Sequence, residues 1–205
     1  MKEEILNTAL RQFLKHGIRQ SSVNKLVEPL NISTKTFYKY YEDKEQLLKD
    51  CLRLYHARQR KIFEQSQTDQ HPGIYIFQAW YYGIESECKI NKLFFSDLNY
   101  YYPALGKEIE KELRKNVWYR FKKVIQKGVY DQVFREGIDA DIFLESISAL
   151  YLSIARSGDF QRLKATIDKI FVNSIGALIR GICSKEHVQE YDKFVRDFIP
   201  EVSLN

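Results

Sequence analysis

The first stretch of the chain is divided into short helical segments by residues that begin or end helices. Ile5, Ala9 and Phe13 recur four residues apart, which places them on one face of a helix. Gly17 follows, and glycine is a common residue just beyond a helix end. The spacing therefore predicts a first amphipathic helix that ends near Gly17.

Two further short helices are expected before residue 43. Ser22 can cap a second helix, which Pro29 limits because the residue before proline avoids helical backbone. Asn31 tolerates the left-handed backbone of a tight turn, and Ser33 can cap a third helix. The pattern predicts three short helices, the last two joined by a turn of about three to four residues, the arrangement of a helix-turn-helix.

Helical periodicity continues along the rest of the chain. Only four prolines occur, and no Asn-Gly or Asp-Gly pair joins alternating strands. Asp43 and Gln46 form a capping-box-like start for the fourth helix. Pro72 and Pro103 suit first-turn positions. Further helices are predicted at about 43–68, 72–89, 91–101, 104–132, 139–157, 160–182 and 185–198, with caps at Asp139 and Asp159 and breaks at Gly137 and Gly158.

Composition excludes several classes of protein. Hydrophobic residues make up 44% and charged residues 29% of the 205 residues, as in ordinary globular proteins. No apolar run approaches the roughly 20 residues that a membrane span needs, and the polar start does not resemble a secretory signal. We therefore expect a cytoplasmic protein with no membrane partner. The three cysteines, Cys51, Cys88 and Cys183, are far apart and are expected to be free thiols.

Net charge alone does not identify a partner. The chain carries +5, but the charge is not concentrated in one part. Residues 1–50 hold nine Lys/Arg and seven Asp/Glu (+2), and the remainder holds 23 and 20 (+3). Because a mild positive charge favours anionic partners only weakly, residue pattern must decide.

Residues 5–48 contain a pattern that is specific enough to indicate a family of proteins. In order and without a gap, the chain has Ile5, Ala9, Phe13 and Gly17, then Ser33, Thr36, Phe37, Tyr38, Tyr40, Tyr41 and Lys44. This pattern over residues 5–48 resembles the TetR family of bacterial transcriptional regulators. The resemblance implies an all-α fold, with an N-terminal three-helix helix-turn-helix DNA-binding domain at 1–46 and a larger helical ligand-binding and dimerisation domain at 47–205.

Side chains around the third helix suit contact with DNA. Phosphate oxygens need hydroxyl, ammonium or helix-terminal amide donors. The resemblance assigns Thr36, Tyr38, Tyr40 and Lys44 to the DNA backbone, whereas Thr34, Lys35 and Lys39 are expected to face base edges. Phe37 and Tyr41 are expected to pack in the core on Phe13 and Leu26, and the Tyr41 hydroxyl then needs a partner. The full predicted set is Ser22, Asn24, Ser33, Thr34, Lys35, Thr36, Tyr38, Lys39, Tyr40 and Lys44.

The middle of the chain is rich in aromatic residues, and small-molecule pockets are mostly apolar with a few polar groups. Core packing is the alternative for each of these side chains. The hypothesis is a cavity for an effector of unknown identity, with an apolar or aromatic compound favoured. Its predicted lining is Trp80, Tyr81, Phe94, Tyr101, Trp118 and Phe121.

The last long helices suit a homodimer. Helices at about 139–157 and 160–182 are apolar enough to form a four-helix bundle with a symmetry mate, and Gly176 and Gly181 would permit close approach. An intramolecular core is the alternative. A helix-turn-helix that reads paired half-sites needs a dimer, which favours the bundle. The residues concerned are Ile142, Ile147, Leu150, Ile154, Ile167, Ile170, Phe171, Ile175, Leu178 and Ile179.

No enzyme signature is present. The chain lacks GxGxxG, HExxH and GxSxG, and Gly176 and Gly181 have P-loop spacing without the following Lys-Ser/Thr. No metal site or cofactor is expected. The favoured function is a ligand-responsive transcriptional regulator, in most such proteins a repressor, that binds a palindromic DNA operator as a dimer. The alternative is a helical interaction module that keeps the helix-turn-helix fold but binds no operator.

Overall fold

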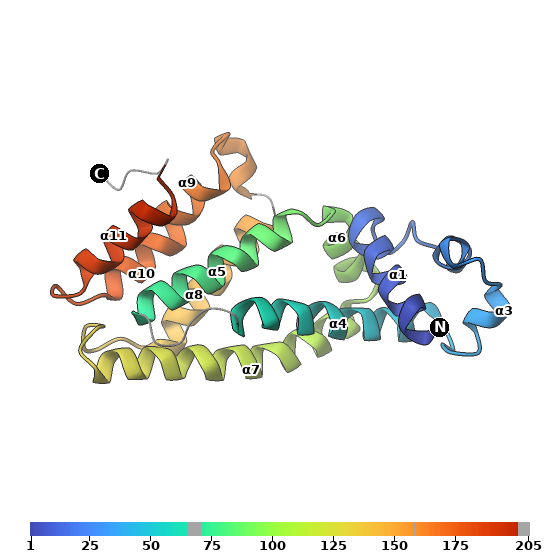
Figure 1. The fold of residues 1–205 in the computed structure, drawn as a ribbon, viewed down its shortest axis with the longest axis horizontal. Coiled ribbons are helices and arrows are strands. Elements are labelled where there is room, and N and C mark those ends of the chain that lie inside the picture. The colour runs from blue at the N-terminus through green and yellow to red at the C-terminus, as the bar shows by residue number, and fades with distance from the viewer. Residues whose placement is uncertain (65–70, 158, 201–205) are drawn as a thin grey trace. The chain divides into compact units, whose positions relative to one another are not determined.

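The computed structural model describes residues 1–64, 71–157 and 159–200, apart from the side chains of 62–64, 113 and 161. Over these ranges the chain is helical, without a β-strand, and one isolated bridge pairs Phe134 with Cys183 (Figure 1). The all-α class is thus confirmed. Among the described helices, none is long and apolar enough to cross a membrane. Cys51, Cys88 and Cys183 form no disulfide bond.

The helices follow the order expected from the sequence. In unit 1, described below, they are α1 (Lys2–His16), α2 (Val23–Val27), the 3₁₀ turn η1 (Glu28–Leu30), α3 (Thr34–Phe37), most of α4 (Lys44–Glu64), α6 (Lys92–Tyr101) and the start of α7 (Pro103–Tyr130). In unit 2 they are α5 (Pro72–Cys88), the rest of α7, α8 (Ala140–Leu152), the π-helical η2 (Ser153–Ser157), the 3₁₀ turn η3 (Asp159–Leu163), α9 (Ile167–Phe171), the π-helical η4 (Val172–Gly176), α10 (Ala177–Ile182) and α11 (Val188–Phe198).

The chain forms two compact units, and each consists of two segments that are separated in the sequence. Unit 1 contains residues 1–61 and 89–114, and unit 2 contains residues 62–88 and 115–205. Unit 1 therefore includes α6, which is separated from α1–α3 by the whole of α5. The functional division expected after residue 46 stays a prediction, since the compact unit around α1–α3 is larger than that segment.

Unit 1 has an apolar core to which six helices contribute. Phe13 of α1, Phe37 of α3 and Phe94 of α6 are fully buried in one cluster. Leu26 and Tyr41 lie in the same cluster, so the prediction that Phe37 and Tyr41 pack with Phe13 and Leu26 is confirmed. The remaining buried members are Ile5, Ala9, Leu10, Ile18, Val27, Leu47, Leu48, Cys51, Leu52, Tyr55, Phe95, Leu98, Leu105 and Ile109.

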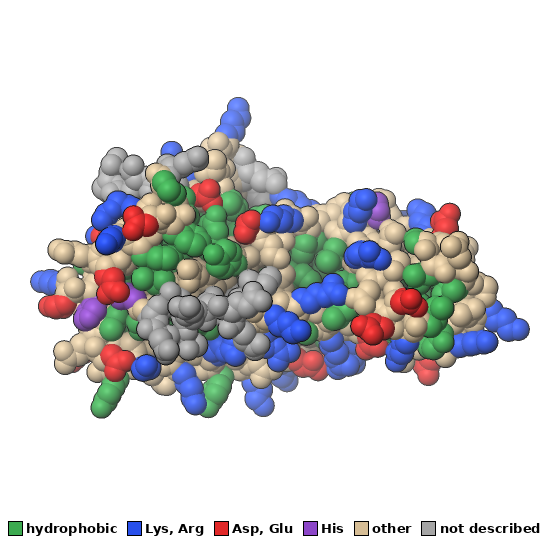
Figure 2. Space-filling model, viewed as in Figure 1, with side chains coloured by type: hydrophobic (Ala, Val, Ile, Leu, Met, Phe, Trp, Pro, Cys, Tyr) green, Lys and Arg blue, Asp and Glu red, His purple; other side chains and the backbone are tan. Residues whose placement is uncertain are grey.

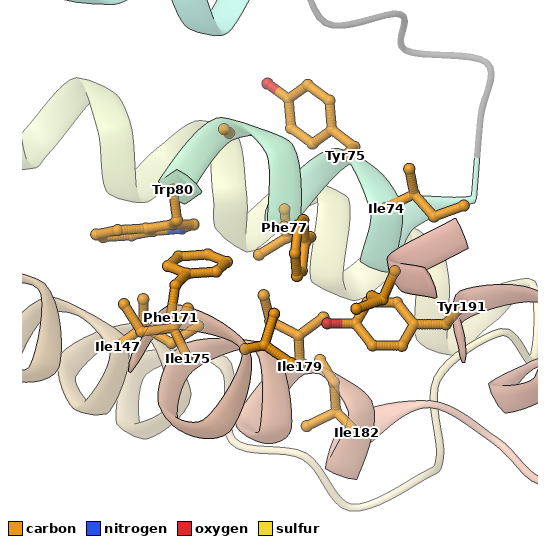
Figure 3. Packing of buried hydrophobic residues seen from close by; sticks show 14 of the residues in the cluster. Ile74, Tyr75, Phe77, Trp80, Ile147, Phe171, Ile175, Ile179, Ile182 and Tyr191 are labelled. Atoms are coloured by element: carbon orange, nitrogen blue, oxygen red, sulfur yellow. The ribbon is translucent and has the colours of Figure 1, made fainter. Parts of the chain in front are cut away.

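Unit 2 has a separate core built around α5. Phe77 packs edge-to-face against Phe171 with ring centroids 4.9 Å apart, and Trp80 lies on the same helix (Figure 3). Tyr191 of α11 completes this core by donating its buried hydroxyl to the Gly176 carbonyl at 2.9 Å. The aromatic α5 is thus mainly a packing element, whose neighbours come from α7, α8, α9, α10 and α11.

Most helix boundaries agree with the sequence prediction, and one is wrong. The expected helix at 160–182 begins only at Ile167, where Thr166 accepts the Lys169 N–H as N-cap. Asp159 does not cap it, because its carboxylate accepts hydrogen bonds from Ser153 and Ser157 instead. Gly158 and residues 65–68 of the expected 43–68 helix lie outside the described residues.

The other predicted caps are present. Pro72 and Pro103 are the first residues of α5 and α7. Asp139 accepts the N–H groups of Asp141 and Ile142 at the start of α8. Both kinds of signal are local, because Asp139 acts through hydrogen bonds within the first turn and proline through its fixed φ.

Candidate DNA-binding site

The turn between α2 and α3 is formed by left-handed backbone and a serine cap. Asn31 has φ 52° and ends η1, as expected for an asparagine in a tight turn. Ser33 then accepts the Thr36 N–H at 3.1 Å, and its hydroxyl also lies 3.1 Å from the Thr36 hydroxyl. This cap fixes the N-terminus of α3.

The second helix begins in the same way. The exposed Ser22 is its N-cap and accepts the Lys25 N–H at 3.5 Å. Asn24, also exposed, lies in the first turn of α2. Both side chains can therefore meet a partner outside the chain.

The aromatic run at 37–41 divides between core and surface. Phe37 and Tyr41 are buried, whereas Tyr38 and Tyr40 remain 56% and 38% exposed. The Tyr38 ring packs edge-to-face on Phe37 at 5.2 Å, which supports the ring without covering the hydroxyl. Beside these rings, Ser33, Lys35 and Lys39 are exposed and Thr34 and Thr36 are half-buried.

The Tyr41 hydroxyl is buried and makes no hydrogen bond with any described residue. The partner that a buried tyrosine hydroxyl needs is therefore not supplied by the described part of the chain. Burial, together with the nearby Asp50 and Cys51, raises the pKa of Tyr41 to about 12. The ring itself is well supported, 5.7 Å from Phe37 and with the Lys2 ammonium 5.4 Å from its centroid.

A capping box begins α4. The Asp43 carboxylate accepts the Gln46 N–H at 2.7 Å, and the Gln46 side chain accepts the Glu42 N–H at 2.7 Å. The predicted Asp43–Gln46 cap is confirmed, with the return bond one residue earlier than in a standard capping box.

Lys44, in the first turn of α4, makes a bond within the chain. Its half-buried ammonium donates to the Ile18 carbonyl at 2.5 Å and lies 5.7 Å from the centre of the Phe13 ring. Burial lowers the pKa of Lys44, and the Asp97 charge partly offsets that decrease.

Sequence reasoning missed the contribution of α6 to this unit. Asn91 donates its backbone N–H to Leu14 O at 3.0 Å and its side-chain amide to Lys15 O at 2.9 Å. Asp97, only 9% exposed, accepts the Arg19 N–H at 2.7 Å. The available signal was a carboxylate between Phe94 and Leu98 on an apolar helix face, which is costly unless it is paired.

Figure 2 shows lysines and arginines spread over the visible face and not gathered in one block, as the even distribution of charge along the sequence suggested. The candidate donors for an anionic partner are therefore identified by their position around α3.

The residues predicted to line an effector cavity divide between the two units. Trp80, Tyr81, Trp118 and Phe121 belong to unit 2, where the Trp80 and Phe121 ring centroids are 5.6 Å apart. In unit 1, Phe94 is fully buried in the core, and Tyr101 is 45% exposed under the Arg19 guanidinium.

Two polar groups of the unit 2 residues are distinctive. Tyr81 donates its hydroxyl to Asp168 at 2.6 Å, and burial, followed by that bond, raises the pKa of Tyr81. The Trp80 indole N–H is buried and has no hydrogen-bond partner among the described residues.

Most of the apolar residues that were predicted to form a dimer interface are buried in the core of unit 2. Ile147, Ile154, Ile170, Phe171, Ile175 and Ile179 are buried in its core. Leu150 and Ile167 are half-buried and pack against that core. Gly176 is buried next to Phe77 and Tyr191, whereas a Cβ on Gly181 would have open space. Ile142 and Leu178 remain 67% and 37% exposed.

Comparison with known proteins gives one family. Residues 5–51 match the family described as "Bacterial regulatory proteins, tetR family". An uncharacterized HTH-type transcriptional regulator, YvkB of Bacillus subtilis (strain 168), is 21% identical over 183 residues, which cover 88% of this chain and 96% of the relative.

Solved structures share the fold. A TetR-family regulator from Cytophaga hutchinsonii aligns with a TM-score of 0.71 and 19% identity, over 90% of this chain and 95% of that one. RolR in complex with resorcinol aligns with a TM-score of 0.59 and 17% identity, over 93% and 91% of the two chains.

Residues 5–51 thus carry the DNA-binding segment of the tetR family of bacterial regulatory proteins, and the fold of the chain is that of solved TetR-family regulators. Both findings agree with the resemblance that the pattern at residues 5–48 indicated.

Proposed function

We propose that this regulator binds a palindromic DNA operator as a homodimer, represses transcription there, and is released by a small molecule. The observation that carries the proposal is the division of the aromatic run at 37–41. Phe37 and Tyr41 anchor α3 in the core, so that Tyr38, Tyr40 and the neighbouring lysines face outward. An operator-binding regulator acts in the cytoplasm, where bacterial DNA lies.

Within α2–α3, the proposed contacts fall into two kinds. Exposed hydroxyls and amides, at Ser22, Asn24, Ser33, Tyr38 and Tyr40, suit phosphates, as does the half-buried Thr36. Lys35 and Lys39, with Thr34, suit base edges, because lysine can donate to guanine O6 and N7. Replacing Lys35 should change sequence preference, whereas replacing Tyr38 should weaken binding to all sequences similarly.

The proposed dimer surface is the outward face of α8 and α10. Most predicted residues fill the unit 2 core, so the surface left for a second copy carries Ile142, Ala149, Leu152, Ala177 and Leu178, all exposed. Gly181 beside them leaves room for close approach. Small and apolar residues on two neighbouring helices suit a four-helix bundle between copies.

The proposed effector is a small aromatic compound with a hydrogen-bond acceptor. Trp80 supports this because a buried indole N–H without a partner costs free energy that an acceptor on a ligand could recover. Phe121 and Tyr151 flank the Trp80 ring at 5.6 and 5.4 Å and supply apolar contacts. RolR, which shares the fold, has been crystallised with resorcinol, a compound of this class.

Selection of bound sequences from random duplex DNA tests the proposal. A two-fold symmetric site would support both operator binding and the dimer. No enrichment would favour the alternative, an interaction module with a helix-turn-helix fold. A thermal-shift series with resorcinol, phenol and cyclohexanol tests the effector, because resorcinol should stabilise the wild type more than Trp80→Phe. An equal increase in melting temperature in both proteins would show that Trp80 does not contribute to effector binding.

A further inference from the structure

The loop between α1 and α2 has a backbone that only glycine adopts readily. Gly17 has φ 83° and ψ 165°. A Cβ at this position would lie 2.9 Å from the Asp97 carboxylate and 2.9 Å from the Leu93 Cβ. The backbone of the loop therefore lies directly against α6, with no side chain between them.

The next peptide group is bonded at both ends. The Ile18 carbonyl accepts the Lys44 ammonium at 2.5 Å, and the Arg19 N–H donates to the Asp97 carboxylate at 2.7 Å. The carbonyl and the N–H belong to one planar unit, the Ile18–Arg19 peptide. A cation from α4 and an anion from α6 thus fix the orientation of a single peptide plane. We call this arrangement, Lys44 and Asp97 on the Ile18–Arg19 peptide, the peptide clamp.

The charges of the clamp match the dipole that they contact. A peptide group has a partial negative charge on oxygen and a partial positive charge on the N–H, so the ammonium and the carboxylate each meet the opposite sign. Hydrogen bonds to charged groups are about twice as strong as neutral ones. Asp97 is 9% exposed and Lys44 is half-buried, so water competes weakly for either bond.

The same helix also contacts the Arg19 side chain. Tyr101 lies one turn after Asp97, and the Arg19 guanidinium carbon is 5.5 Å from the centre of its ring. Three residues later, Ser22 caps α2. The residue bonded to α6 thus lies three positions before the N-cap of α2, the first helix of the helix-turn-helix.

We propose that Asp97 and Lys44 are positioning residues for DNA binding: they fix the Ile18–Arg19 peptide and so place the N-terminus of α2 for its phosphate contacts. The inference rests on the proposed operator binding. It gives the Lys44 ammonium a role inside the protein in place of the phosphate contact expected from the sequence.

The salt dependence of binding separates positioning from contact. A lysine that neutralises a phosphate contributes about one unit to the slope of log K against log salt. Lys44→Met and Asp97→Ala should each weaken binding to the selected operator, by about tenfold, the loss of one hydrogen bond to a charged group. The slope should stay at the wild-type value in both. Lys107→Met and Glu110→Gln, at exposed positions of unit 1, are the matched controls and should leave affinity unchanged.

An NMR measurement reports on the clamp itself. In the wild type, the short bond to Asp97 should shift the Arg19 amide proton downfield and slow its exchange. Asp97→Asn keeps an acceptor oxygen and removes only the charge, so it should retain the fold and give an intermediate shift and an intermediate affinity. This variant keeps the test valid if Asp97→Ala unfolds.

Two outcomes would overturn the inference. One is a slope that falls by about one unit in Lys44→Met, which would return Lys44 to the phosphate contacts. The other is wild-type affinity in Asp97→Asn despite a shifted Arg19 amide. Failure of the wild type to bind any duplex would instead count against the proposed function, so the two failures are distinguishable.

Discussion

Two pairs of tyrosines, one pair in each unit, place their hydroxyls in opposite surroundings. In unit 2, Tyr81 donates to Asp168 and Tyr191 to the Gly176 carbonyl, so these hydroxyls are paired within the chain. In unit 1, Tyr38 and Tyr40 carry their hydroxyls into solvent beside the exposed lysines of α3. Other tyrosines are exposed in both units, among them Tyr100, Tyr119 and Tyr130, but Tyr38 and Tyr40 lie within five residues of two exposed lysines, Lys35 and Lys39. The difference indicates that Tyr81 and Tyr191 serve packing, whereas the hydroxyls of Tyr38 and Tyr40 are available to a partner.

The largest expected effect concerns the close approach of loop and helix in unit 1. Gly17→Ala should lower the free energy of unfolding by about 2–4 kcal/mol, because the backbone strain and the crowding against Asp97 and Leu93 add. Gly137→Ala is the matched control. It has a similar φ of 77° but nothing within 4 Å of the added Cβ, so it should lose only about 1 kcal/mol. Urea unfolding measures the free energy of unfolding of both variants. Equal losses of stability would contradict the close contact of Gly17 with Asp97 and Leu93.

Removing hydroxyls should separate the two units directly. Tyr191→Phe should destabilise the protein by about 1–2 kcal/mol, because the buried Gly176 carbonyl loses its donor. Tyr38→Phe should leave stability within about 0.5 kcal/mol of wild type and lower operator affinity instead. Thermal unfolding and DNA titration of both variants make the test. A stability loss in Tyr38→Phe would mean that its hydroxyl is structural.

Acid should act on unit 2 through His71. The His71 ring is buried in unit 2, and its Nδ1 accepts the Gly73 N–H at 3.0 Å. Burial, the largest cause, lowers the pKa of His71, and His187 lowers it further, against the opposing Glu190 charge and backbone hydrogen bonds.

The pKa of His71 is lower in the folded protein than in the unfolded chain, where it is about 6.5. The contribution of neutral His71 to stability is therefore complete above about pH 6.5. It should fall by up to about 1.4 kcal/mol per pH unit as pH decreases from there toward the folded pKa. Urea unfolding between pH 5 and 8 measures the slope, and His71→Gln should flatten it. An unchanged slope in the variant would assign the pH dependence to other groups.

The smallest expected effect is a gain. Tyr41→Phe removes a buried hydroxyl that has no partner among the described residues, so it should raise the free energy of unfolding by about 1 kcal/mol. Tyr81→Phe is the control, since the same change there breaks a bond to Asp168 and should destabilise. Destabilisation in Tyr41→Phe would show that its hydroxyl has a partner, such as a buried water.

Local sequence signals predicted the positions of most helices. Contacts between residues far apart in the sequence could not be predicted. Asn31, Ser33 and Asp43 act through bonds to neighbours within three residues, so the sequence alone located the helix-turn-helix. Asp97 contacts Arg19, 78 residues away, and no local pattern predicts that pairing. The start of α9 was misplaced because Asp159 and Thr166 are both good caps, and serine side chains in η2 engage Asp159 first.

The path of the chain has a consequence for building hybrid regulators. Because unit 1 contains residues 89–114 as well as 1–61, a graft of the first 46 residues onto the C-terminal part of a different regulator would leave α6 behind. The transplanted loop would then lose the donors of Asn91 and the acceptor of Asp97. A hybrid that is to keep the DNA sequence specificity of this chain should therefore carry both residues 1–61 and residues 89–114. Alternatively, the host protein should supply a helix with an Asp or Glu that can accept the Arg19 N–H.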